Sequence, residues 1–391
     1  MSIFAPLRDR INSMLSNISR RADSIITKFY RVHFVFVCLL AIIGYGLVLL
    51  FPILAILSAT NIYEIILEGD AIDWQGAGIW MLVLVLSSLL SYRISRIKLD
   101  PPVGLTVAEE KLPEIVKLVQ QYQAHFKQLD IQRIVITTNY ELDIVKIPKF
   151  ALPIWSMNTM VIGLPVLLCL SPGQFECMVA RRIGQFSKRT NPITNWIYQL
   201  RSIWKQYYFA YSKQKNPDSY ILKWLYAAYA SIYTSASVYA ARKDELNADS
   251  YAMELFTHED VREMITADAT YQWYLKERYW PAINKIASIK SKPALTPYHN
   301  ITAAILTNFK EDKIKSLTNK VFKTETHRKS PYPTMLQRLE NVGHDSPYLP
   351  ENTGEVAAAK YLGESQKSVV NLIDTLWLKD NMESHKRSKK K

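Results

Sequence analysis

Two long apolar runs lie near the start of the chain, separated by a short acidic stretch. Residues Phe34 to Leu57 carry no charge, and Trp74 to Tyr92 form a second, shorter uncharged run. A helix of about 20 apolar residues crosses the hydrocarbon core of a bilayer. The pattern predicts two transmembrane helices forming a hairpin. A buried core helix is the alternative interpretation for the second run.

The charges around the hairpin are asymmetric. Bases flank both of its ends, whereas the connecting loop is purely acidic, and basic flanks remain in the cytoplasm. We therefore expect an integral protein of the bacterial inner membrane, with both termini and the main domain in the cytoplasm. The bases are Arg8, Arg10, Arg20, Arg21, Lys28, Arg31, Arg93, Arg96 and Lys98, and the acids are Glu64, Glu68, Asp70 and Asp73.

The first 30 residues carry apolar positions at three- and four-residue intervals, with arginines between them. This spacing predicts an amphipathic helix that lies on the anionic inner leaflet, or alternatively packs on the soluble domain. The charged leader and the first apolar run are both too long for a signal peptide, so we expect the anchor to be retained.

The pattern changes to that of a soluble domain after Pro101-Pro102. Thr106 with Glu109 has the spacing of a capping box, which predicts a helix to about Phe126. β-branched residues predict a strand over 131–137, and 142–168 is expected to be extended, with a sheet strand at 158–164. Helices are expected to dominate the remainder, so the fold class is α+β and mostly helical.

Ser171-Pro172-Gly173-Gln174 is a strong start signal for a helix that should run to about Lys188. At 100° per residue, Arg182 falls inside the apolar sector of this helix, with Gln185 beside it and Arg181 at its border. Such side chains need buried partners, which indicates a polar site or cleft. The alternative is that the arginine stems cover apolar surface while their heads reach water.

The sequence from Pro217 to Leu255 is compatible with one long helix. Glu245 and Asp249 share a face of it, and the small residues Ala248 and Ala252 beside them permit close approach of another helix. A solvated face with a local Arg242–Glu245 pair is the alternative. The many aromatic residues from Trp196 to Tyr239 are expected to serve helix packing or contact with the bilayer surface, rather than a ligand cage.

Composition narrows the classes of protein to which this chain can belong. The chain has 391 residues, 49% of them hydrophobic, which excludes general disorder. Its net charge of +13 is partly concentrated at the C-terminal end, and no nucleic-acid motif accompanies it. The three cysteines lack paired or metal-ligand spacing, so we expect buried thiols in a reducing compartment. No nucleic-acid partner is expected.

The order of these elements resembles the integral-membrane zinc peptidases related to HtpX and the CAAX prenyl protease, over roughly residues 30 to 345. Arg181-Arg182-Ile183-Gly184-Gln185 stands at the position of the His-Glu-x-x-His motif. Glu245 matches the third zinc ligand and Asp249 the outer-shell aspartate. NTMVIGLPVLL, which begins at Asn158, resembles the strand that borders the substrate cleft. SPYPTMLQRLENVG resembles the late His-Pro-x-x-x-x-Arg segment, with Tyr332 in place of histidine and Pro333 and Arg338 kept.

The resemblance implies a zincin-like metallopeptidase domain with a small sheet, in which Asn158, Tyr332 and Arg338 line the cleft. This chain departs from the family at the residues that would bind the metal. Zinc needs three protein ligands, and arginine offers only hydrogen-bond donors. Arg182 also replaces the carboxylate that takes a proton from water. We therefore expect no catalytic residue and no metal or other cofactor.

We expect guanidinium groups to replace the metal electrostatically. Arg181 or Arg182 would then bond to Glu245 and Asp249 in a structural clamp. The seven histidines have no spacing that suits two ligands on one helix; they are His33, His125, His258, His299, His327, His344 and His385.

The function expected is that of a catalytically inactive homologue that binds or regulates a membrane or cytosolic protein. One alternative is an active zinc endopeptidase with unconventional ligands. Another is a membrane scaffold with a closed cleft. The expected segments are a basic leader at 1–32, the hairpin at 33–98 with spans at 34–57 and 74–92, the main domain at 99–350, and a C-terminal helix with a disordered basic tail at 351–391.

Overall fold

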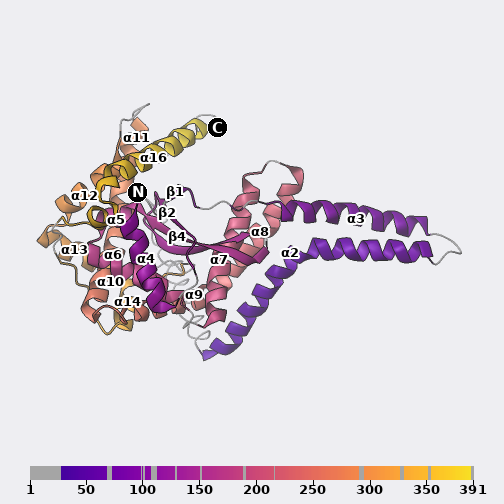
Figure 1. Ribbon diagram of the computed structural model, residues 1–391, viewed down its shortest axis with the longest axis horizontal. Coiled ribbons are helices and arrows are strands. Elements are labelled where there is room, and N and C mark those ends of the chain that lie inside the picture. The colour runs from indigo at the N-terminus through magenta and orange to yellow at the C-terminus, as the bar shows by residue number, and fades with distance from the viewer. Residues whose placement is uncertain are drawn as a thin grey trace, which may run out of the picture. The chain divides into compact units, whose positions relative to one another are not determined.

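The computed structural model of the chain is mostly helical (75%) and has one small mixed sheet (Figure 1). The residues that it describes are 28–67, 73–97, 99, 102–106, 112–127, 130–149, 152–187, 191–214, 216–289, 295–325, 330–350 and 354–388. The leader expected to be an amphipathic helix lies almost wholly outside these residues.

The described part of the chain contains four strands, and helices make up most of the rest. The strands are β1 (Gly104–Thr106), β2 (Arg133–Thr137), β3 (Leu142–Lys149) and β4 (Leu152–Gly163). The helices up to the middle of the chain are α2 (Tyr30–Leu67), α3 (Trp74–Ser95), α4 (Pro113–Phe126), α5 (Leu164–Cys169), α6 (Pro172–Gln185), α7 (Pro192–Ser212), α8 (Pro217–Ala236) and α9 (Val238–Ala252). Those that follow are α10 (His258–Tyr274), the π-helical turn η1 (Leu275–Tyr279), α11 (Trp280–Ile289), α12 (Pro297–Asn308), α13 (Glu311–Phe322), α14 (Met335–Asn341), α15 (Ala357–Leu362), the 3-10 turn η2 (Gly363–Ser365) and α16 (Gln366–Ser388).

The chain divides into two compact units. Unit 1 comprises Met1–Asp100, Ile147–Ser156 and Trp196–Ala241, and unit 2 comprises Pro101–Lys146, Met157–Asn195 and Arg242–Lys391. Residues 196–241, which were expected within the main domain at 99–350, group with the apolar hairpin in the structure.

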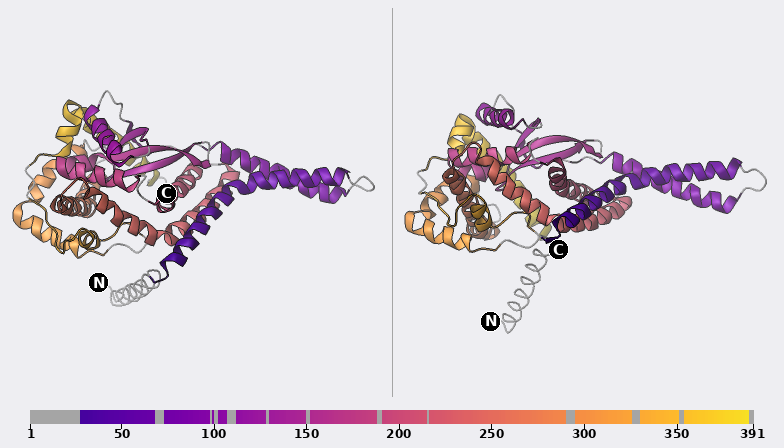
Figure 2. Two further views of the ribbon diagram at one scale, coloured as in Figure 1. Left: turned by 60° about the horizontal axis from the view of Figure 1, so that its bottom comes forward. Right: turned by 90° about the horizontal axis from the view of Figure 1, so that it is seen from below.

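Helices α2 and α3 of unit 1 lie side by side (Figures 1 and 2). Both are long and apolar enough to cross a membrane. Helix α2 extends the expected run at both ends and continues to Leu67 as a 38-residue helix with Pro52 inside it. Helix α3 begins at Trp74 as expected and continues to Ser95. Most of their large apolar side chains are exposed, as is usual for helices that contact lipid.

Helices α7 and α8 supply an aromatic core to unit 1. The rings of Trp204, Tyr207 and Tyr226 are stacked, and Tyr211 stacks on Tyr226 at a centroid distance of 5.5 Å. All four side chains are buried. The prediction that these aromatic residues serve helix packing is confirmed.

The four-stranded sheet has the strand order β1-β2-β4-β3. Strand β1 is antiparallel to β2, and β2 is parallel to β4 with Val135 opposite Val161. Helix α6 packs on α4 and on α10, and α15 packs on α4, α5 and α6. The β-branched residues of β2 and the centre of β4 are buried. The expected strand over 131–137 is confirmed from Arg133 onward, and the one over 158–164 is confirmed as far as Gly163.

The expected capping box at Thr106 is wrong. Thr106 ends β1, where it lies opposite Val135, and the helix begins at Pro113, with Leu112 as a cap residue whose side chain makes no capping bond. Proline suits the first turn of a helix because its missing N–H has no intrahelical partner there. Pairing in the sheet and Pro113 together set the helix start, which the local Thr-x-x-Glu pattern did not show.

The expected extended conformation of Leu164 to Leu168 is also wrong, because this segment is the buried helix α5. Pro165 lies in the first turn of that helix. A proline removes a ladder hydrogen bond from a sheet but is tolerated where a helix begins. The strand therefore ends at Gly163, one residue before the helix.

The single helix expected from Pro217 to Leu255 is two helices, α8 and α9, divided at Ser237. The guanidinium of Arg201 donates to the Thr234 carbonyl (2.6 Å) and to the Ser237 hydroxyl (2.7 Å). These bonds satisfy polar groups at the junction, so an interruption of the helical ladder costs little there.

The C-terminal helix α16 runs to Ser388. The stretch from His385 that was expected to be disordered is therefore helical as far as Ser388, and residues 389–391 lie outside the described part. Val369 and Ile373 are buried as expected, whereas Leu372 is exposed. All three cysteines are free thiols, with Cys169 and Cys177 buried.

Candidate functional site

Helix α6 carries the arginines and is fixed at its start by a complete capping box. The Ser171 hydroxyl accepts from the Gln174 amide, and the Gln174 side chain accepts from the Ser171 amide. Gln174 also donates to Glu263 at 2.8 Å. The predicted capping box is confirmed, and the helix that it starts presents Arg181, Arg182 and Gln185 to the interior, where all three are buried.

Close approach of α6 and α9 lets these side chains meet their partners. A Cβ atom added to Gly184 would lie 2.5 Å from the Cβ of Tyr251 on α9. Only glycine fits such a contact without moving a helix. Two of the three carboxyl residues of α9, Glu245 and Asp249, are completely buried.

Arg181 bridges two acids of α9, Glu245 and Asp249. Its Nη2 atom lies 2.6 Å from Glu245 Oε2, and its Nε atom lies 2.6 Å from Asp249 Oδ1. The same Nη2 donates to the Glu245 carbonyl at 3.0 Å. These are charge-assisted bonds between groups with almost no exposure to solvent, so each partner depends on the other for its solvation.

Arg182 lies on the other side of Glu245. Its Nη1 atom is 3.0 Å from Glu245 Oε1 and 3.6 Å from Asp143 Oδ1, and it donates to Gln185 Oε1 at 2.5 Å. Gln185 in turn donates to Asp244 at 3.0 Å. Arg182 is therefore a cation shared by two carboxylates and an amide.

Arg338 on α14 closes the group. Its Nε and Nη2 atoms donate to the two oxygens of Asp249 at 3.0 and 2.8 Å, and its Nη1 atom donates to Asp268 on α10 at 3.0 Å. A two-pronged bond of this kind fixes the orientation of both groups. We call this set the arginine–carboxylate cluster; its members are Asp143, Arg181, Arg182, Gln185, Asp244, Glu245, Asp249, Asp268 and Arg338.

Carboxyl groups outnumber guanidiniums in the cluster by five to three. Burial raises the pKa of Asp249, but Arg181 and Arg338 outweigh burial and hold that pKa below its ordinary value. Asp244 faces no comparable pair: burial raises its pKa to about 6, and Glu245 adds to the effect. Burial and Glu245 likewise raise the pKa of Asp143, against the attraction of Arg182. Asp244 and Asp143 are therefore the carboxyl groups of the cluster whose ionised form is disfavoured by burial and by the neighbouring Glu245.

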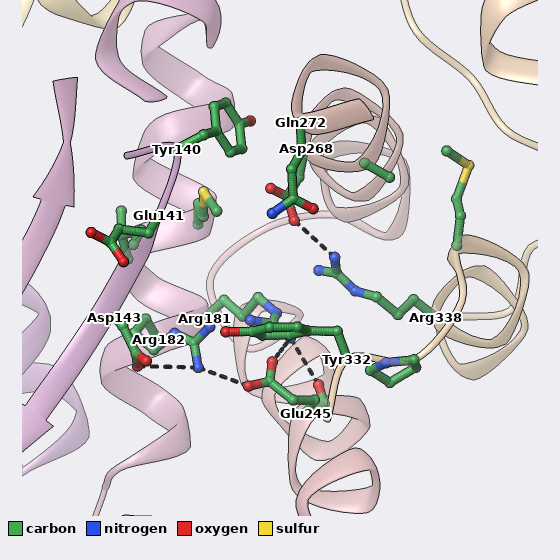
Figure 3. Close-up of a pocket in the computed structure, with 15 residues that line it drawn as sticks. Tyr140, Glu141, Asp143, Arg181, Arg182, Glu245, Asp268, Gln272, Tyr332 and Arg338 are labelled. Atoms are coloured by element: carbon green, nitrogen blue, oxygen red, sulfur yellow. Dashed lines mark hydrogen bonds and ion pairs between the residues drawn. The ribbon is translucent and has the colours of Figure 1, made fainter. Parts of the chain in front are cut away.

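A cavity of about 140 Å³ lies beside the cluster. Figure 3 shows Arg182 between Asp143 and Glu245, Tyr332 beside them, and Arg338 reaching Asp268. Tyr332 is 48% exposed at the rim. The other lining residues are Tyr140, Glu141, Leu142, Met178, Ala269, Gln272, Pro333 and Met335.

The structure brings together Arg181, Arg182, Gln185, Glu245, Asp249, Tyr332 and Arg338, all named from the sequence. Asn158 is the exception among the expected cleft residues. Its side chain donates to the Asp130 carbonyl at 2.9 Å, and its own carbonyl accepts from Gln132, so it fixes the loop before β2 and does not line the cavity. The alternative of a solvated face is wrong, because Glu245 is completely buried. Arg242 donates to the Ser330 carbonyl.

Three acids of the cluster were missed by the sequence analysis. Asp143 is the second residue of β3, Asp268 lies on α10, and Asp244 precedes Glu245 on α9. Asp244 could have been found, since the buried face of α9 that carries Glu245 also has to accommodate its neighbour. Asp143 and Asp268 come from distant segments, and nothing in their local sequence marks them.

The side chains at the positions where the resemblance to zinc peptidases implies ligands do not fit a zinc ion. Arg181 and Arg182 have no lone pair to donate to a metal, and the Gln185 oxygen is a weak neutral ligand, so Glu245 is the one strong ligand left. Within the described part of the chain, no group of three or more His, Cys, Asp or Glu side chains is arranged to hold a metal ion.

No family model, curated protein or solved structure matches this chain.

Proposed function

We propose that this chain is a membrane-anchored, zincin-like relative of the HtpX-type peptidases that has lost metal-dependent hydrolysis and binds a protein partner through the cavity beside the arginine–carboxylate cluster. The observation that carries the proposal is the bonding of Arg181 and Arg182 to Glu245 and Asp249. Charges that a dication would neutralise in a zinc site are neutralised here by guanidiniums.

The chemistry of the cluster supports a binding role over a hydrolytic one. Hydrolysis of a peptide by the family's route needs a proton acceptor beside an activated water. Arg182 holds its proton at all ordinary pH values and is itself bonded to Glu245 and Gln185. The carboxylates of Glu245 and Asp249 are likewise engaged by arginines, which leaves them no role as a base.

The cavity supports a role for a partner. It has room for one side chain but not for a folded segment, and its rim carries Tyr332, which is half exposed. Exposed aromatic residues beside a pocket are frequent anchors of protein interfaces. We infer that a side chain of a membrane or cytosolic protein enters here. An open cavity also argues against the alternative of a scaffold whose cleft has closed.

Rebuilding the metal site tests the relationship to the peptidases. The variant with Arg181→His, Arg182→Glu and Gln185→His restores His-Glu-x-x-His opposite Glu245, so we expect it to bind about one zinc ion per chain. The wild type should bind far less than one. Equilibrium dialysis against zinc, followed by elemental analysis of the purified full-length protein, measures both.

The matched control adds Glu245→Gln to the triple variant, which should weaken zinc binding by removing the third ligand. Absence of zinc from a folded triple variant would contradict the zincin-like arrangement. Stoichiometric zinc in the wild type, with proteolysis that disappears in Glu245→Gln, would establish the alternative of an active peptidase with unconventional ligands.

Site-specific crosslinking tests the partner role. A photoreactive phenylalanine at Tyr332 should capture a protein in native membranes, whereas the same group at Tyr348, which is 50% exposed but does not line the cavity, should not. Filling the cavity with Ala269→Phe should abolish the capture. Equal capture at both tyrosines, or capture unaffected by Ala269→Phe, would show that this cavity is not the binding site.

A further inference from the structure

Helix α2 is much longer than the helix it pairs with. It has 38 residues against 22 in α3, which correspond to about 57 and about 33 Å at a rise of about 1.5 Å per residue. A span of about 30 Å is enough for the hydrocarbon core. Because the two helices are joined by a short connection, α3 accompanies only the second half of α2. The first half needs another environment.

That first half is as apolar as the second. Its outward side chains Val35, Phe36, Leu39, Ile42 and Ile43 are between 54 and 59% exposed. Figure 1 shows that α2 bends between the part beside α3 and the part nearer its start. Pro52 inside the helix accounts for a bend, because it removes a backbone hydrogen bond.

The inner face of this first half packs against α7 and α8. The Tyr229 hydroxyl donates to the Leu40 carbonyl at 2.6 Å, and Trp196 donates to the Tyr45 hydroxyl at 2.8 Å. A Cβ atom at Gly44 would collide with the rings of Tyr229 and Trp204. These bonds and this close packing hold α7 and α8 against the first half of α2, just before the part of α2 that pairs with α3.

The outer face of α7 and α8 is apolar and aromatic as well. Phe209, Tyr220, Ile221, Trp224 and Ile232 are between 57 and 72% exposed, and Trp224 is the most exposed of them. Large exposed patches of this kind mark an interaction surface. Tryptophan and tyrosine beside aliphatic residues are typical of the layer where hydrocarbon meets headgroups.

The charge of α7 and α8 indicates that their exposed face contacts lipid. Residues 192–236 contain four lysines and the buried Arg201, but a single acid, Asp218. Interfacial helices combine such basic residues with aromatic and aliphatic ones, because the bases bind anionic headgroups while the rings enter the acyl boundary. A protein partner would not need a surface continuous with helices that cross the bilayer.

We propose that the first half of α2, together with α7 and α8, forms a platform embedded in the interfacial layer of the bilayer, on the side where the basic flanks of the hairpin lie. The platform inserts its aromatic face, centred on Trp224, among the lipids. The proposal depends on α2 and α3 crossing the membrane and is independent of the arginine–carboxylate cluster.

Spin labels on single cysteines test the platform. The full-length chain with Cys38→Ala is reconstituted in vesicles of phosphatidylcholine with a minority of phosphatidylglycerol, since Cys169 and Cys177 are buried. Labels at Trp224→Cys and, separately, at Ile221→Cys should be relaxed more by oxygen, which concentrates in lipid, than by a water-soluble nickel complex. Leu86→Cys on α3 is the lipid control, and Ser316→Cys, exposed on α13, is the water control.

Each outcome bears on the proposal. The proposal is supported if the ratio of relaxation by oxygen to relaxation by the nickel complex at positions 221 and 224 is closer to that of Leu86→Cys than to that of Ser316→Cys. Labels that match Ser316→Cys while Leu86→Cys reports lipid overturn the platform but leave the anchor intact. A Leu86→Cys label in water overturns both. Protection of 221 and 224 from both reagents, by contrast, would indicate a protein partner on this face and would also overturn a lipid contact.

Discussion

At the scale of single residues, the interior of unit 2 is organised by mutual dependence of buried charges. Arg181 and Arg338 both bond to Asp249, and Arg181 and Arg182 both bond to Glu245. A charge removed from water in this way is expensive unless it is paired and hydrogen-bonded. The cluster should therefore be sensitive to the loss of any one member.

Removal of Arg181 should destabilise the protein by about 3–5 kcal/mol, because Glu245 and Asp249 would keep buried charges with fewer partners. Urea unfolding of the purified chain in detergent measures the change. Lys117→Ala breaks an exposed pair with Glu114 and should cost less than about 1 kcal/mol. Arg181→Lys keeps the positive charge but loses the planar guanidinium that bonds to two carboxylates, so its loss of unfolding free energy should lie between those of the other two variants. Equal costs for the buried and the exposed pair would contradict this reading of the cluster.

Asp244→Asn should stabilise the protein at neutral and alkaline pH. The pKa of Asp244 is raised from 3.8 to about 6 in the folded chain, so the folded state binds a proton more tightly than the unfolded state. The resulting penalty grows as pH rises from about 4 to about 6 and is constant above it. It amounts to up to about 3 kcal/mol. Urea unfolding at pH 8 should therefore favour the variant, whereas below pH 4 the two proteins should be equally stable; an advantage independent of pH would exclude this cause.

At the scale of elements, the cluster exists because α6 and α9 approach more closely than ordinary side chains allow. Gly184 meets Tyr251 directly, and Ala248 on α9 is completely buried. The capping box at Ser171 sets where α6 begins and therefore the depth at which its arginines lie.

Gly184→Ala should destabilise the protein by about 1–3 kcal/mol, because the added methyl would force two packed helices apart. Gly173→Ala on the same helix is the matched control, since an added Cβ there meets nothing within 4 Å. Alanine is the better helix former, so this second variant should be neutral or slightly stabilising. Thermal unfolding of both variants in detergent provides the comparison. A neutral Gly184→Ala would mean that the approach of the helices does not depend on glycine.

At the scale of the whole molecule, the chain alternates between its two units. Residues 1–100, 147–156 and 196–241 belong to the unit that contains the apolar helices, and the other segments form the second unit. The helix with Arg181 and the helix with Glu245 are thus separated in sequence by the aromatic helices α7 and α8. Insertion of a segment from one unit into another requires only that its ends lie close together.

We expect the acidic loop between α2 and α3 to lie on the far side of the membrane from the main domain, because basic flanks stay in the cytoplasm. In intact cells, Asp70→Cys should react with a membrane-impermeant maleimide. Ser316→Cys should react only after permeabilisation. The reverse pattern would invert the proposed orientation, and reaction of both in intact cells would exclude a cytoplasmic main domain.

Several features follow from local sequence alone. Uninterrupted apolar runs predict α2 and α3, and the Ser-Pro-x-Gln signal together with the helical phase of Arg182 predicts a capped helix with a buried arginine. These are properties of a segment of a few turns, so neighbours in the chain are enough to specify them. The pairing of Arg181 with Glu245 and Asp249 was also predicted, because the order of motifs suggested which helices face each other.

Other features were decided only by contacts between distant segments. Asp143 and Asp268 join the cluster from a strand and a helix whose sequences give no sign of it, and Arg201 interrupts a helix that propensity alone would continue through Ser237. Pairing with Val135 turned Thr106 from a helix cap into the end of a strand. In each case the free energy of a tertiary contact exceeds the small preference of the local chain, and that contact is absent until the chain has folded.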